Sequence, residues 1–217
     1  MERRVREARL SAALRRRRPI REPYDRILIV CEGEKTEPDY FEDLRRHFRL
    51  SSANIEIAEN DEGSNPINVV DCAIKRYRSD RGYDRVYCVF DRDRHARYRE
   101  ALAKIEEERV RKNVPIQAVP SIPCFEFWIL LHFEFTTRQF DVVDGSICDE
   151  VIRSLRTYLP EYRKGEPVFD HLVGRIDAAI TNAQRVILFH ETSGTDNPST
   201  RVHELVQNLR LLNSAVR

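Results

Sequence analysis

Residues 26–31 (RILIVC) constrain the fold most, because their apolar character is almost unbroken. A strand with one face in water alternates apolar and polar side chains, whereas a continuous apolar run indicates a strand that is covered on both faces. The run stops abruptly at Glu32, which is followed by a glycine and then by a helix-like pattern. We therefore expect a buried strand of a parallel sheet, with an acidic residue at its carboxyl end.

Strand and helix patterns alternate along the first 135 residues. The expected strands are residues 26–31, 54–59, 84–91 and 114–120. The expected helices are residues 36–48, 65–80, 96–110 and 123–133. The last of these is a short apolar helix or a buried strand, and Pro123 favours the helix. This order predicts an α/β fold, in which a central, mostly parallel sheet of about four strands is flanked by helices.

Strand patterns fade from about residue 148, and the rest of the chain has helical spacing. We expect a basic arm at residues 1–21 and a single domain at residues 22–217. Within that domain, a β/α part covers about 24–135 and a helical part covers about 148–217.

Two local patterns predict where helices begin. Thr36 and Asp39 resemble a capping box, in which each side chain binds a backbone N–H of the first turn. Asn197 followed by Pro198 resembles a cap and a first-turn proline. We expect helices to start at both places.

The composition is that of a soluble protein with a heavily charged surface, being 41% hydrophobic and 34% charged. No apolar run approaches the roughly 20 residues that span a bilayer, and the N-terminus lacks the apolar core of a signal peptide. The five cysteines are scattered and show no CxxC spacing, which argues against a disulfide framework or a structural zinc site. We expect a cytoplasmic protein that does not bind membranes.

The N-terminal arm is strongly basic. Residues 1–21 hold nine arginines and two glutamates, a net charge of +7, whereas the whole chain carries +1. Its densest part is the run Arg15, Arg16, Arg17 and Arg18. Charge alone leaves two explanations open, a solvated arm or an arm that binds the phosphates of nucleic acid.

Acidic residues stand at the ends of two predicted strands. Glu32 follows the first strand, and Asp91 and Asp93 lie at and just past the end of the third. In open parallel sheets, ligands bind beyond the carboxyl ends of the strands, and residues two apart in extended chain face the same side. Three converging carboxylates repel one another unless a cation compensates, and Mg²⁺ prefers such oxygen ligands. The pattern therefore predicts a site for Mg²⁺ or Mn²⁺.

Three further glutamates have competing explanations. Glu37 is best explained as an acid at a helix N-terminus, where negative charge is favoured, and Glu34 stays undecided. Glu126 is the one carboxylate in the apolar segment "PCFEFWILL", where burying it alone would be costly. It is either an exposed first-turn residue or a fourth acid that reaches the same pocket.

Four blocks of sequence, "VCEGEKTEPDYF", "VFDRDRH", "SIPCFEFWILLHFE" and "TDNPSTRVHELV", resemble the RloB-like (AbiLii-type abortive-infection) proteins of bacteria. The resemblance runs from about residue 24 to 210. It implies a TOPRIM-like fold of Rossmann type, with a glutamate after the first strand and a D-x-D after a later one, which together hold Mg²⁺ for phosphodiester chemistry. Glu32 matches that glutamate, and Asp91 and Asp93 match the D-x-D.

The resemblance implies a Mg-dependent nuclease, the effector of a phage-defence system, which cuts RNA (tRNA among the candidates) or DNA beside an AAA or ABC-type ATPase partner. Catalytic candidates are Glu32, Asp91, Asp93, Glu126 and Lys164. Lys164 would stabilise charge on the scissile phosphate, or is an exposed loop lysine. Candidates for binding nucleic acid are Arg15, Arg16, Arg17, Arg18, Lys35, Arg92 and Arg94.

A non-catalytic TOPRIM-like subunit, which binds nucleic acid or regulates an ATPase, is the alternative. The presence of all three motif acids favours catalysis. A polymerising or strand-passing enzyme is disfavoured, because the chain is too short for the additional domains such enzymes need. The sequence has no Walker A motif, so hydrolysis of ATP through a P-loop is not expected. The oligomeric state stays open, and a homodimer is compatible with the sequence.

Overall fold

The computed structural model describes residues 25–60, 63, 65–92, 95–141 and 145–214. Its centre is a five-stranded sheet with the strand order β2-β1-β3-β4-β5. The strands are β1 Ile27–Cys31, β2 Ile55–Glu59, β3 Arg85–Asp91, β4 Ile116–Ile122 and β5 Ser199–Thr200. β1 to β4 are parallel, and the two-residue β5 pairs with β4 in the antiparallel direction. The predicted α/β fold with a mostly parallel sheet is confirmed, with one strand more than expected.

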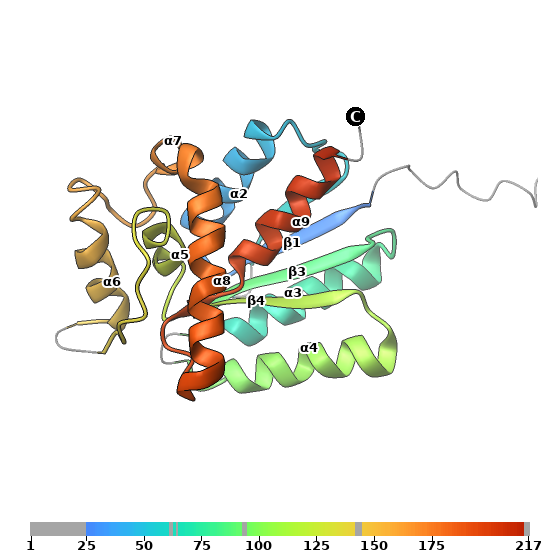
Figure 1. Ribbon diagram of the computed structural model, residues 1–217. Coiled ribbons are helices and arrows are strands. Elements are labelled where there is room, and N and C mark those ends of the chain that lie inside the picture. Colours follow the sequence, from blue (N-terminus) through green and yellow to red (C-terminus); the bar gives the residue numbers. More distant parts are fainter. Residues whose placement is uncertain (1–24, 61–62, 64, 93–94, 142–144, 215–217) are drawn as a thin grey trace, which may run out of the picture.

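Helices cover both faces of this sheet (Figure 1). One face is covered by α3 Pro66–Ser79 and α4 Tyr98–Lys112. The other is covered by α2 Thr36–His47, α8 Ile176–Ser193 and α9 Val202–Ser214. Beyond the carboxyl ends of the strands lie α5 Glu126–Leu130, α6 Ile147–Leu155, α7 Phe169–Leu172 and the 3-10 helix η1 Val173–Arg175. Among the described residues, no helix combines the length and the apolar character needed to cross a membrane.

Strand β1 contributes to both hydrophobic cores. Leu28 and Val30 pack in the core beneath α3 and α4, whereas Ile27, Ile29 and Cys31 pack in the core under α2, α8 and α9. All five side chains are fully buried. The unbroken apolar run therefore marks a strand with helices on both faces, as the sequence predicts.

The capping box predicted at Thr36 is absent. Helix α2 begins at Thr36, but its N-cap is Lys35 and no side chain caps it. The hydroxyl Oγ1 of Thr36 instead accepts a hydrogen bond of 3.0 Å from the backbone N–H of Gly165. A long-range bond has replaced the local one, and it ties the loop before α7 to the start of α2.

The helix start predicted at Asn197 is also wrong. Its Nδ2 donates to the backbone carbonyl of Phe140 over 2.9 Å. The next residues form β5 beside β4, so α9 begins only at Val202. Pairing with β4 satisfies backbone groups that a helix would otherwise have used.

Cys124 and Cys148 form a disulfide bond, contrary to the expectation from cysteine spacing. They are 24 residues apart in sequence, yet their Cα atoms lie 5.9 Å apart. Cys124 precedes α5, and Cys148 lies in the first turn of α6. The packing of α6 against α5 brings them together, and cysteine spacing carries no information about that packing.

Candidate active site

Glu32 links the carboxyl ends of β1 and β3. Its carboxylate Oε2 accepts a hydrogen bond of 2.8 Å from the backbone N–H of Asp91, and Oε1 lies 3.3 Å from Nε2 of His95. The side chain is only 7% exposed. In the sheet, β2 lies on one side of β1 and β3 lies on the other. The order of the strands therefore reverses direction between β1 and β3. Open α/β sheets bind their ligands at such a reversal, so Glu32 stands where a ligand is expected.

Asp91 ends β3 and faces the same edge. Burial raises the pKa of its carboxyl well above the ordinary value, and the nearby carboxylates of Glu37 and Glu126 raise it further. The structure therefore brings Glu32 and Asp91, the two described acids of the strand-end pattern, together with Glu126. Asp93, the second acid of the D-x-D, lies outside the described residues, so its place in the site stays a prediction.

Glu37 belongs to this cluster, which corrects its interpretation as a simple acid at a helix N-terminus. It lies in the first turn of α2, but it is only 3% exposed. Its carboxylate lies so close to Gly33 that a Cβ there would force the Glu37 side chain to shift. Burial, followed by the charge of Glu126, raises the pKa of Glu37 to about 7. Glu34, the undecided acid, is exposed.

The sequence contained a signal for Glu37. Residues three and four apart share one face of a helix, so Glu37 lies on the same face as the buried Tyr40, Phe41 and Leu44. An acid on the apolar stripe of a helix is an exception that calls for compensation.

Glu126 is fully buried, so the alternative of an exposed first-turn residue is wrong. It opens the short helix α5. The hydroxyl of Tyr162 donates to its Oε1 over 3.4 Å, and Nζ of Lys164 lies 3.7 Å from the same oxygen. Sγ of Cys148 lies 3.0 Å from Oε2. Glu126 thus reaches the acidic cluster from the first turn of α5.

Lys164 supplies positive charge to the cluster. Its side chain is 54% exposed, but its ammonium group reaches Glu126. Burial alone would lower its pKa, and the carboxylates of Glu126 and Asp91 outweigh that effect and raise it. The bond from Gly165 to Thr36 fixes the loop that carries this lysine.

A hollow of about 550 Å³, here called the acidic cleft, opens beside these residues. It is lined by the acids Glu32, Glu34 and Glu37 and by Lys35 and Lys164, among others. Lys35, predicted to bind nucleic acid, therefore lies at the cleft.

The remaining residues predicted to contact nucleic acid are arginines. Arg92 forms an ion pair with Asp196. Arg94 and the run Arg15, Arg16, Arg17 and Arg18 lie outside the described residues. Their contacts with nucleic acid stay predictions.

The donor set of the acidic cleft fits a hard divalent cation. Its ligands would be carboxylate oxygens, which Mg²⁺ and Mn²⁺ prefer, and Mg²⁺ commonly uses only one or two of them together with water. Among the described residues, the group whose ligand atoms all lie within 4.8 Å of one another is instead Cys124, Glu126 and Cys148. Both of its sulfur atoms are held in the disulfide. Glu32, whose carboxylate accepts a hydrogen bond from the backbone N–H of Asp91, and Asp91 itself are thus the better candidates to hold a cation.

A family model of RloB-like proteins matches residues 27–209. The chain belongs to the RloB-like family. The match includes every described acid of the cluster and Lys164. No curated protein and no solved structure matches this RloB-like chain.

The raised pKa of Glu37 predicts how the stability of this RloB-like protein changes with pH. In an unfolded chain this carboxyl titrates near 4.5, and in the folded protein it titrates near 7. Between these values the folded state binds more protons, so the free energy of unfolding falls as pH rises, by about 3 kcal/mol in total. The raised pKa of Asp91 likewise makes the free energy of unfolding fall as pH rises.

We therefore expect Glu37→Gln to raise the melting temperature of the metal-free protein at pH of about 8 and to have little effect near pH 5, where Glu37 is protonated. Thermal unfolding in EDTA across this pH range would measure the change in melting temperature. Glu107→Gln, at an exposed ion pair with Arg111, is the matched control and should leave the melting temperature nearly unchanged at both pH values. An equal shift for both variants would contradict the account of Glu37.

Proposed function

We propose that this RloB-like protein is a divalent-metal-dependent nuclease with a TOPRIM-like catalytic domain. The observation that carries the proposal is the cluster of four carboxylates, from Glu32, Glu37, Asp91 and Glu126, at the reversal between β1 and β3. Such a concentration of acid is costly to bury, and functional sites are where such costs are commonly found. The family resemblance supports phosphodiester hydrolysis as the chemistry and phage defence as the setting.

Glu32 and Asp91, with Asp93, would hold Mg²⁺ or Mn²⁺. A bound divalent ion neutralises phosphate charge and lowers the pKa of a coordinated water. The chain itself supplies the orientation of these ligands. The hydrogen bond from the backbone N–H of Asp91 orients the carboxylate of Glu32. Asp91 is held in position because it is the last residue of β3.

Lys164 and Glu37 have separate roles in this proposal. The ammonium group of Lys164 lies at the acidic cleft, where it would stabilise negative charge that develops on the phosphate. The carboxyl of Glu37, with a pKa of about 7, holds or releases a proton near neutral pH. A group with such a pKa suits general acid or base catalysis.

One observation favours the alternative, a non-catalytic subunit that binds nucleic acid or regulates an ATPase. Within the described part of the chain, the acids of the cleft do not form a group of three with all ligand atoms within 4.8 Å. A binding module needs no such arrangement. In either case an ATPase of AAA or ABC type and nucleic acid are the proposed partners, and activity assays separate the two functions.

The nuclease proposal predicts cleavage that depends on Asp91. Wild-type protein should cleave at least one of tRNA, single-stranded DNA and plasmid in Mg²⁺ or Mn²⁺, and EDTA should stop the reaction. Asp91→Asn keeps the shape of the side chain but removes its charge, so it should abolish cleavage. Asp43→Asn, at a partly exposed ion pair on α2, is the control and should cleave like wild type. Cleavage by Asp91→Asn at the wild-type rate would contradict the proposal, as would the absence of metal-dependent cleavage with all three substrates.

Glu126 offers a test that separates catalysis from structure. Glu126→Gln keeps the volume and the bond to Tyr162 but removes one buried charge. We expect cleavage to fall about 100-fold or more. The metal-free protein should be at least as stable as wild type, because the substitution relieves charge repulsion with Glu37 and Asp91. Lys164 is half-exposed and still has the carboxylates of Glu37 and Asp91 near its ammonium group.

Cleavage rates and melting temperatures of the same preparation would measure both effects. Glu107→Gln again serves as the control. If Glu126 were needed only as the ion-pair partner of Lys164, the variant would lose stability while its folded fraction cleaved normally. That result would remove Glu126 from the active site.

A further inference from the structure

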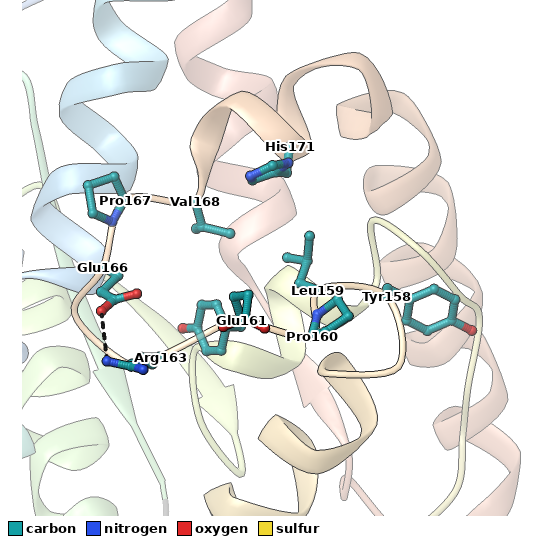
Figure 2. Close-up of a pocket in the computed structure, with 10 residues that line it drawn as sticks. Tyr158, Leu159, Pro160, Glu161, Arg163, Glu166, Pro167, Val168 and His171 are labelled. Carbon is teal, nitrogen blue, oxygen red and sulfur yellow. Dashed lines mark ion pairs between the residues drawn. The ribbon is translucent and has the colours of Figure 1, made fainter.

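A second hollow, of about 430 Å³, lies in the segment between α6 and α7. Figure 2 shows Val168 and His171 on one side of it and Leu159 and Pro160 on the other. Its size is in the range of pockets that hold small organic groups. We call it the loop pocket.

Tyr162 connects the loop pocket to the acidic cleft. It lines the loop pocket, and its hydroxyl lies 3.4 Å from Oε1 of Glu126. Two residues later, Lys164 lines the acidic cleft and lies 3.7 Å from the same oxygen. Because both atoms lie against the same oxygen, the hydroxyl of Tyr162 and Nζ of Lys164 are at most about 7 Å apart. A strand whose phosphate lies at Lys164 can therefore place a neighbouring base at the loop pocket, which Tyr162 lines.

The chemistry of the loop pocket suits a nucleobase. Leu159 and Pro160 give it apolar walls, whereas Arg163, Glu166 and His171 bring polar groups to its edge. A base has flat apolar faces and a rim of donors and acceptors. Proteins bind unpaired bases by stacking them on aromatic or histidine rings or on arginine, and by hydrogen bonding to their edges.

The polar groups at the edge are available to a ligand. Arg163 and Glu166 form an ion pair at 3.9 Å, and their side chains are 72% and 54% exposed. Such a pair contributes little to stability, so either partner can turn to a base at small cost. His171 is exposed as well. The loop that carries Lys164 is tied to the start of α2 by the bond from Gly165 to Thr36.

We infer that the loop pocket binds an unpaired nucleobase next to the scissile phosphate. This inference rests on the proposed nuclease function and extends it to the substrate. A base must leave its duplex to enter a pocket of this kind, so the preferred substrate is single-stranded or looped nucleic acid.

The test uses Asp91→Asn protein, which is expected not to cut nucleic acid, and measures its affinity for short single-stranded RNA and DNA by fluorescence anisotropy. Adding His171→Ala should weaken binding about tenfold, because stacking on one side chain is commonly worth a factor of this order. Adding His171→Phe keeps a ring for stacking and should leave the affinity near that of Asp91→Asn alone. His171 is exposed, so both variants should fold.

A second series uses oligonucleotides that lack the base at one position. Removing the base that enters the loop pocket should weaken binding, and on that oligonucleotide His171→Ala should have no further effect. Equal affinity with and without His171→Ala on intact strands would overturn the inference, as would a loss that persists on every oligonucleotide with a missing base. Loss of nucleoside monophosphate binding, with oligonucleotide affinity unchanged, would assign the pocket to a free nucleotide instead. These readouts need no cleavage, so failure of the inference is distinct from failure of the nuclease proposal.

Discussion

Repulsion among buried carboxylates is the constraint on which the structure depends. Glu32, Glu37 and Glu126 are almost completely buried, and Asp91 stands beside them at the end of β3. Burying such charges without compensation costs several kcal/mol for each ion. The fold offsets part of this cost in three ways: a backbone hydrogen bond to Glu32, protons on the acids whose pKa is raised, and the ammonium group of Lys164. A divalent cation, as proposed, would offset much of the remainder, and its binding would then be coupled to the stability of this edge.

The loop before α7 joins the acidic cleft to its surroundings. It carries Lys164 into the cleft and Tyr162 against Glu126, and Gly165 fastens it to the first residue of α2. Helix α2 in turn carries Glu37. These few contacts link the charge of the acidic cleft, the position of the loop and the loop pocket. A change in one of them should therefore affect the other two.

The sequence predicts the parts of the site that depend on local order. The pattern predicts Glu32 and Asp91 because Glu32 follows one apolar strand and Asp91 ends another, and parallel strands end at one edge. Glu37 is not a simple N-terminal acid, and its helical phase with Phe41 places it on the buried face. The bond between Thr36 and Gly165, the pairing of β5 and the disulfide join segments that the chain brings together only on folding. Such contacts leave no periodic signal, which is why the sequence patterns instead predict a capping box at Thr36, a helix start at Asn197 and no disulfide framework.

The most direct measurement is a crystal structure of the protein with Mn²⁺ and a single-stranded oligonucleotide, in which anomalous scattering locates the ion. The account predicts an anomalous peak at the carboxyl ends of β1 and β3, within coordination distance of carboxylate oxygens of both Glu32 and Asp91, with a phosphate oxygen in the same shell. Nucleic acid bound at the cleft with no ion there, or an ion bound only elsewhere in a protein that cleaves, would contradict it.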